Sequence, residues 1–425
     1  MEIKQKDFMR LEFIQGLIGS GVFLLLALAL SEDKKSVSWG KISRLMLSHV
    51  LLLWCFLKFP LCQRGLLFLG KGVQVLRESV LKGTGFVFGY LGGDTAPFVL
   101  AEGKGSLFIF MFQALPMIVV LSALSMLFFH WRILPFFVTH LSKVTQRLWN
   151  IGGALGTVMA AKLFLGQTDA PFLIRPYLNS LTRNELFSMM TAGMATASST
   201  LFVLFTLLLE KSLGSQAIVH VLTSAVINIP SALIMSELMM PERASKTEGT
   251  YVAPHTFINS MEALTKGTLD GWKIMGIVAA MVLVSLSLVA LVNAALSSLC
   301  VCLTGCAFSI EQGLGLFFWP WIWCMGIPKE EVFTAGGILA TKTLLNELAA
   351  LIPLAKACTL SKRSISILSY SLCSFGNLSS IAIQVGALGG LIPERKSELA
   401  RLAPRALVAG TLAGWFSGAI VSLFI

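Results

Sequence analysis

Polar and charged residues interrupt an otherwise apolar stretch at residues 162–177, and this interruption is where chemistry is to be expected. The polar residues nearest its centre are Lys162, Gln167, Thr168 and Asp169. A charged side chain at membrane depth costs roughly 2.5 to 3.5 kcal/mol on translocon-insertion scales, so it persists only where it faces protein, water or a ligand. We therefore predict that this stretch is a site.

A second stretch, residues 336–350, repeats this pattern in the other half of the chain. It is again apolar and is interrupted by Thr341, Lys342, Asn346 and Glu347. The offset between the two stretches is nearly constant at about 179 residues, which puts Asp169 and Glu347 in corresponding places. Two interrupted apolar segments at matching positions of two halves are the best indication in a sequence of a secondary transporter's binding site. We therefore predict that a substrate binds between the two interruptions.

The side chains in and after the two stretches have a chemistry that fits a particular kind of solute. Amides and hydroxyls can match the donor and acceptor pattern of a ring, and a carboxylate can accept from two vicinal hydroxyls. This predicts a polyhydroxylated or heterocyclic solute. For Asp169 and Glu347, structural pairing with Lys162 and Lys342 is the alternative explanation. The candidate residues are Gln167, Thr168, Asp169, Glu347, Asn377 and Ser380.

The elements that must position these residues are membrane helices. Of the 425 residues, 55% are hydrophobic and only 13% are charged, a balance that is unlike a water-facing surface. Eight apolar runs approach or exceed the length of a membrane span. The runs are 13–30, 45–59, 107–129, 186–209, 217–236, 274–303, 364–390 and 406–425. The first run is longer than the apolar core of a usual signal peptide and is preceded by acidic residues, so we expect a retained span.

The two interrupted stretches are predicted to be re-entrant hairpins. Each arm has about ten residues, which is too short to cross a bilayer alone. The expected fold is therefore an all-α polytopic membrane protein with about eight transmembrane helices, two re-entrant helical hairpins, interfacial helices and an inverted-repeat transport core. We expect four parts. These are 1–148 (N-terminal spans and scaffold), 149–240 (first hairpin and following spans), 241–330 (polar connector, long span and aromatic interfacial helix) and 331–425 (second hairpin and following spans).

Charge and composition argue against other classes of protein. The formal charge of +11 comes from Lys and Arg between the spans, where they set topology, so we expect no nucleic-acid partner. The densest cysteine group, Cys300, Cys302 and Cys306, ends an apolar run without a nearby histidine, which predicts no metal site. The five histidines are scattered and form no catalytic pattern. We therefore expect neither an enzyme nor a bound cofactor.

Three motifs resemble those of the concentrative nucleoside transporters. They are residues 166–177 (GQTDAPFLIRPY), 341–347 (TKTLLNE) and 373–380 (CSFGNLSS). Shorter similarities at 86–89, 391–395 and 405–411 extend the resemblance from about Trp39 to the C-terminus. Three long motifs in the right order make the resemblance specific.

The resemblance implies a homotrimer in the lipid bilayer, most simply the bacterial inner membrane. Each protomer would hold one nucleoside between two hairpins and two discontinuous helices and would move it by elevator-like alternating access. Carried over by position, Gln167 and Thr168 would contact the base, with Asp169 near them. The ribose would be held by Glu347, Asn377 and Ser380, and Phe375 would pack beside the ligand.

The chain departs from the family pattern at two positions. Asp169 stands where the family usually has glutamate, and Lys162 stands where members use an asparagine as a sodium ligand, four residues before the hairpin glycine. Thr196 keeps the hydroxyl of a second sodium ligand. An ammonium group at Lys162 supplies the positive charge itself and repels Na⁺. We therefore expect that Lys162 and Thr196 form a coupling-cation site that does not use Na⁺.

Two functional hypotheses follow from these departures. The first is a nucleoside carrier driven by H⁺ or running as a uniporter or exchanger, with Asp169 or Glu347 as candidate proton carriers. The alternative is a nucleoside-binding membrane sensor or structural protein without transport. The polar residues retained on both hairpins favour the carrier.

Overall fold

The computed structural model describes residues 2–98, 108–252, 257–305, 309–357 and 359–425. Every regular element within these ranges is helical, which confirms the predicted all-α class. Five of the described helices are long and apolar enough to cross a membrane. They lie at Glu12–Ala29, Trp39–Lys58, Phe110–His130, Gln216–Met239 and Ser260–Leu303, and each contains or overlaps a predicted span.

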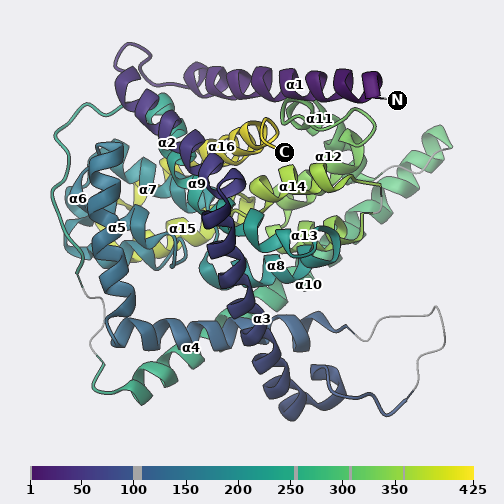
Figure 1. The fold of residues 1–425 in the computed structure, drawn as a ribbon, viewed down its shortest axis with the longest axis horizontal. Helices are drawn as coiled ribbons and strands as arrows, with labels where there is room; N and C mark the ends of the chain where they lie inside the picture. The colour runs from purple at the N-terminus through teal and green to yellow at the C-terminus, as the bar shows by residue number, and fades with distance from the viewer. Residues whose placement is uncertain (1, 99–107, 253–256, 306–308, 358) are drawn as a thin grey trace.

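The N-terminal part consists of long helices that surround the rest of the molecule. Helix α1 (Glu2–Ala29) crosses one edge of the view in Figure 1, and α4 (Pro116–His130) lies near the opposite edge. The other elements are α2 (Trp39–Lys58), α3 (Pro60–Phe88), the 3₁₀ turn η1 (Gly89–Gly92), the π-helical turn η2 (Phe110–Ala114) and α5 (Ile133–Trp149). Pro60 separates α2 from α3 because it disfavours a helical conformation at the preceding Phe59, which is extended.

The longest helix, α10 (Ser260–Thr304), packs along α4 through glycines. A Cβ atom on Gly267 would lie 2.7 Å from the Cα atom of Ala123, and one on Gly271 would lie 2.7 Å from the Cα atom of Val119. Only glycine permits this approach, as in other close helix contacts in membranes. Beyond this contact, α10 exposes apolar side chains such as Leu283 and Leu291. The polar connector predicted at the start of the part 241–330 therefore ends at residue 259, just before α10 begins.

The two interrupted stretches form helix–break–helix units, as predicted. The first comprises α6 (Gly153–Ala161) and the 3₁₀ segment η3 (Ala170–Ser180), and the second comprises α12 (Val332–Leu344) and α13 (Glu347–Lys356). The return arm of the first is not an α-helix, because Pro176 lies within it and the backbone kinks at Ile174. In the second, Thr341 and Lys342 lie inside α12, and the break is at 345–346.

The span after each hairpin is a pair of helices and not one continuous helix. α7 (Arg183–Ala195) and α8 (Ser199–Leu213) are separated at 196–198, and α14 (Lys362–Leu372) and α15 (Leu378–Leu391) are separated at 373–377. Between the two units run α9 (Gln216–Met239), α10 and α11 (Ile310–Cys324), and the chain ends with η4 (Pro393–Arg395) and α16 (Lys396–Val421). The packed helices α9 and α16 lie between α6 on one side of the view and α12 on the other (Figure 1).

Candidate functional site

A cavity of about 550 Å³ lies where the two hairpins face α4 and α10. All seven residues predicted to bind substrate line it: Gln167, Thr168, Asp169, Glu347, Phe375, Asn377 and Ser380. They come from three separate segments, which are the break of the first hairpin, the start of α13 in the second hairpin, and the α14–α15 break with the first turn of α15. The helix breaks bring these segments together because an interrupted helix ends at the cavity instead of crossing it.

The second hairpin presents a carboxylate that is held in a defined orientation. Asn377 caps α15, with its side-chain oxygen accepting from the Ser380 backbone N–H at 2.9 Å and from the Ser380 hydroxyl at 3.0 Å. The same side chain donates through Nδ2 to Glu347 Oε2 at 2.9 Å. Asn346 caps α13 through the Ala349 backbone N–H at 2.8 Å. The N-termini of α13 and α15 therefore both lie next to Glu347, and their partial positive charge favours a carboxylate there.

The first hairpin presents a hydroxyl, an amide and a second carboxylate. The Thr168 hydroxyl donates to Asp169 Oδ1 at 3.2 Å, and the Asp169 side chain is exposed toward the cavity. Gln167 is buried, and its side-chain oxygen has no hydrogen-bond partner within the described part of the chain. This tip is therefore less fully hydrogen-bonded than the tip that carries Glu347.

The residue expected to replace a sodium ligand is fully buried. Lys162 ends α6, is 1% exposed, and its ammonium group has no hydrogen-bond partner among the described residues. A Cβ atom built on Gly193 of α7 would lie 3.5 Å from this ammonium nitrogen. Lys162 therefore lies between the first hairpin and α7. Thr196 lies at the end of α7, and its hydroxyl donates to the Ala192 carbonyl of the same helix at 2.7 Å.

The lysine of the second hairpin differs in its contacts. Lys342 Nζ donates to the Ser371 carbonyl at 3.0 Å and to the Ser374 hydroxyl at 2.8 Å. In the described ranges, neither Lys162 nor Lys342 forms an ion pair within 4.0 Å with Asp169 or Glu347. The described contacts therefore do not include the ion pairs of Lys162 with Asp169 and of Lys342 with Glu347 that were the alternative explanation.

Sequence reasoning missed the opposite wall of the cavity. Lys266 and Asp270 of α10 form an i,i+4 ion pair at 2.8 Å, and both line the cavity together with serines of α4. The polar composition of their stretch predicted a connector, whereas Lys266 and Asp270 lie on α10. Their i,i+4 spacing is the sequence signal that could have placed them on one face of a helix. Gln384, a lone amide in an apolar run, was missed as well. It is 1% exposed on α15, and its Nε2 donates to the Met190 carbonyl of α7 at 3.0 Å.

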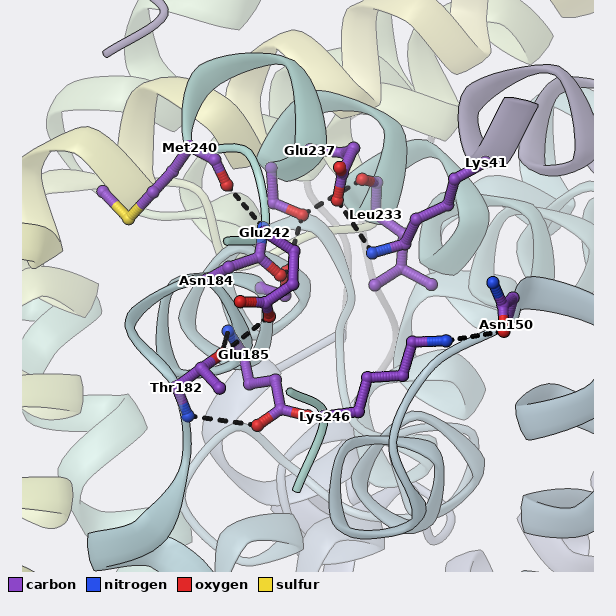
Figure 2. Close-up of polar contacts among 12 residues, drawn as sticks. Lys41, Asn150, Thr182, Asn184, Glu185, Leu233, Glu237, Met240, Glu242 and Lys246 are labelled. Atoms are coloured by element: carbon purple, nitrogen blue, oxygen red, sulfur yellow. Dashed lines mark hydrogen bonds and ion pairs between the residues drawn. The ribbon is translucent and has the colours of Figure 1, made fainter. Parts of the chain in front are cut away.

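A polar network holds the base of the first hairpin (Figure 2). Thr182 and Glu185 form a capping box at the start of α7, and the Thr182 hydroxyl also donates to Glu242 at 2.7 Å. Lys246 donates to Asn150 at 2.6 Å. Burial lowers the pKa of Lys246, and the nearby cations Lys41 and Arg44 lower it further.

The connector continues as a strap across the hairpin. The Thr247 hydroxyl donates to Glu185 Oε2 at 2.6 Å, and the Val252 backbone N–H donates to the Leu173 carbonyl at 2.8 Å. A buried ion pair of 2.8 Å between Lys41 and Glu237 joins α2 to the end of α9, just before the connector begins. The first hairpin is thereby fixed at its base, whereas its tip is free to contact a ligand.

Paired hairpins, two broken helices and a cavity with polar side chains at their meeting point are features of a multi-pass membrane transporter. Two family models match the chain: "Na+ dependent nucleoside transporter N-terminus" at residues 18–91 and "Na+ dependent nucleoside transporter C-terminus" at residues 220–422. An uncharacterized transporter, YutK of Bacillus subtilis, is 31% identical over 422 residues, which cover 96% of this chain and 99% of YutK. The nucleoside permease NupC of Helicobacter pylori is 28% identical over 414 residues, covering 96% of this chain and 97% of NupC.

Solved structures agree with these matches. CNTnw in an inward-facing, substrate-bound state superimposes with a TM-score of 0.88 at 27% identity, covering 97% of this chain and 98% of that chain. A CNTnw variant in an outward-facing state gives a TM-score of 0.89 at 26% identity, covering 97% of both chains. This protein belongs to the concentrative nucleoside transporter family.

Proposed function

We propose that this protein carries nucleosides across the membrane by alternating access without Na⁺ bound at the first hairpin. The observation that carries the proposal is the buried ammonium group of Lys162, which lies between the hairpin and α7 and has no partner among the described residues. The nucleoside substrate is supported by the family and by the named permease among the relatives.

The residues of the cavity divide the substrate between the two hairpins. Gln167 and Thr168, with Asp169 beside them, bind the base, and Phe375 packs against the ring. The sugar is held by Glu347, Asn377 and Ser380. The hydrogen bond from Asn377 to Glu347 Oε2 orients the carboxylate, whose remaining lone pairs can accept from ribose hydroxyls.

Lys162 acts in this proposal as a tethered cation. Two unit charges 4 Å apart repel each other by about 4 kcal/mol at an effective dielectric constant near 20, so Na⁺ does not bind beside a charged Lys162. The hairpin is instead held against α7 by a positive charge that travels with the protein. Transport is then driven by H⁺, with Asp169 or Glu347 as the carrier, or runs as uniport or exchange.

Uptake of radiolabelled uridine into proteoliposomes tests substrate and coupling together. Imposed Na⁺, H⁺ and zero gradients are compared at one membrane potential, with empty liposomes as the control. We expect uptake that a Na⁺ gradient alone does not increase. Clear stimulation by that gradient would overturn the coupling proposal, and uridine binding without flux would instead identify a sensor.

The Lys162→Asn variant sharpens this test. Asparagine removes the charge and restores an oxygen ligand, so we expect uptake to become at least partly dependent on Na⁺. Lys211→Asn is a suitable control because Lys211 is an exposed lysine outside the cavity. If the Lys162→Asn variant takes up uridine equally well with and without Na⁺, then the lysine at position 162 is not the reason that uptake is independent of Na⁺.

The assembly and division of the chain complete the proposal. The exposed apolar side chains of α10 suit contact with lipid or with other copies of the chain, in a homotrimer of the bacterial inner membrane. Residues 1–148 and 241–330 form the scaffold, and residues 149–240 and 331–425 form the moving halves. The mass of the detergent-solubilised particle, measured by light scattering with the detergent subtracted, tests the trimer, and a monomer would count against it.

A further inference from the structure

Three side chains that meet at Gly193 each carry a buried polar atom without a hydrogen-bond partner among the residues described. The atoms are Lys162 Nζ, Gln167 Oε1 and Gln384 Oε1. The first two belong to the first hairpin and the third to α15, in the other half of the chain. A buried polar atom is costly when it is left unpaired, so three such side chains at one meeting point call for a common explanation.

Gly193 of α7 defines the meeting point. A Cβ atom built on this glycine would lie 2.4 Å from Gln384 Nε2, 3.3 Å from Gln167 Cβ and 3.5 Å from Lys162 Nζ. Any other residue at position 193 would therefore occupy the space that these three side chains share. The absence of a side chain on Gly193 allows the hairpin, α7 and α15 to approach one another here.

The orientation of the Gln384 amide follows from its neighbour. The Met190 carbonyl can only accept, so the atom 3.0 Å from it must be the amide nitrogen of Gln384. The Gln384 oxygen consequently points away from Met190 and remains an acceptor. Lys162 supplies three donors and no acceptor. The two amide oxygens and the ammonium group are thus complementary, either in direct contact after a small rotation or through one buried water, which needs two to four polar partners.

We propose that Lys162, Gln167 and Gln384 act as one hydrogen-bonded unit that fixes how the Gln167 amide faces the cavity. An ammonium group cannot accept a hydrogen bond, so Gln167 must turn its oxygen toward Lys162. Its NH₂ group is then left for the cavity that Gln167 lines. This carrier therefore offers the nucleobase a donor at that position and selects bases with an acceptor there. The inference rests on the proposed function, because it concerns recognition in the same cavity.

Gln384 is a positioning residue in this unit. It does not line the cavity, but it supplies the second acceptor for Lys162 and ties both to α7. Without Gln384 the ammonium group loses one of its two amide partners, and the Gln167 amide is free to rotate. Gln384 should therefore change selectivity although it does not touch the substrate.

Sulfur-for-oxygen analogues of uridine test the proposal. Sulfur is a weaker acceptor than a carbonyl oxygen, so 2-thiouridine or 4-thiouridine should bind the wild-type protein about fivefold more weakly than uridine, as for one weakened hydrogen bond. In Lys162→Met and in Gln384→Met, which keep the side-chain volume, this penalty should fall to less than about twofold. Binding of all three nucleosides is measured by competition against radiolabelled uridine.

The buried lysine of the other hairpin supplies the matched control. Lys342→Met should weaken binding of uridine and of both analogues by a common factor and leave the penalty unchanged, because Lys342 contacts the α14–α15 break and not Gln167. The proposed unit of Lys162, Gln167 and Gln384 is overturned if the thio analogues bind more weakly than uridine by the same factor in the wild-type protein and in both test variants. It is also overturned if the wild-type protein binds the analogues as well as uridine. Absence of uridine binding in the wild-type protein counts against the proposed function instead.

Discussion

The two hairpins each bury one lysine, but the surroundings of the two ammonium groups differ. Lys342 donates to the Ser371 carbonyl and the Ser374 hydroxyl, so it holds the second hairpin to the break between α14 and α15. Lys162 has no such partner within the described ranges. Burying a charged group without direct partners is costly, and a residue kept only for stability would not be expected there. This difference favours a structural role for Lys342 and agrees with the functional role proposed for Lys162.

The carboxylates of the two tips also differ in their hydrogen bonds, and again the group on the second hairpin is bonded to another segment of the chain. Glu347 receives a hydrogen bond from Asn377 and lies beside two helix N-termini, whereas Asp169 is contacted by its neighbour Thr168 and faces the open cavity. Among the described residues, the polar groups at the tip of the second hairpin are therefore more fully hydrogen-bonded than those of the first. This agrees with the proposal that the second hairpin binds the sugar, which is common to the substrates, and that the first hairpin binds the base, which varies.

The largest expected effect is that of Glu347→Gln. Two charge-assisted hydrogen bonds of about 1.5 to 3 kcal/mol each would be weakened, so uridine uptake should fall at least 100-fold. Asp169→Asn should reduce uptake by about tenfold, because that carboxylate is less constrained. Glu330→Gln, an exposed carboxylate beside the second hairpin, is the matched control and should transport normally. Equal losses for Glu347→Gln and Asp169→Asn would contradict the division between the tips.

Replacing each lysine by methionine separates stability from transport. Lys342→Met leaves the Ser371 carbonyl and the Ser374 hydroxyl without their donor and should destabilise the protein by about 2 kcal/mol. Lys162→Met removes the hydrogen bonds proposed for this ammonium group together with the desolvation cost of a buried charge, so the two effects offset each other and the change in stability should be less than about 1 kcal/mol. Thermal unfolding of the two purified variants without substrate measures the difference. The assignment of roles fails if Lys162→Met is the less stable of the two.

Much of this architecture was predictable because apolar runs and their interruptions are local features of a sequence. The runs at 13–30 and 217–236 lie within or nearly within α1 and α9, and the breaks at both hairpins follow from Asp169, Pro171 and Asn346 in apolar surroundings. The seven predicted binding residues meet at one cavity because the two halves repeat the same pattern. The roles of these residues remain predictions.

What the sequence could not provide was contact between distant segments. Gln384 is one amide in an apolar helix, and only the packing of α15 against α7 brings it to Gly193. Lys266 and Asp270 likewise reach the cavity because glycines let α10 approach α4. The partners of Lys342 were also unpredictable, since the only partner that the sequence suggested for it was Glu347, as the alternative explanation for that carboxylate.

The bases of the two hairpins offer the smallest and last contrast. Thr182 caps α7 and donates to Glu242 of the connector, whereas Ser361 caps α14 and donates to Glu331 at 3.1 Å, and no connector is hydrogen-bonded across this second base in the part of the chain that the structure describes. Thr182→Ala loses both a cap and a tie to the connector and should cost about 1.5 kcal/mol, and Ser361→Ala should cost about 1 kcal/mol.

Neither Thr182 nor Ser361 lines the cavity, so the affinity for uridine should change less than twofold in each variant. Thermal unfolding together with uridine competition checks this, and Ser180→Ala, an exposed hydroxyl next to the first cap, is the control. Of the two hairpins, the first is the one that the connector strap contacts. Thr182→Ala should therefore also increase hydrogen exchange at residues 247–252. If hydrogen exchange at residues 247–252 is unchanged in a normally folded variant, the strap is held by its other contacts. The first of these to test are the two hydrogen bonds that Thr247 donates to the Glu185 carboxylate.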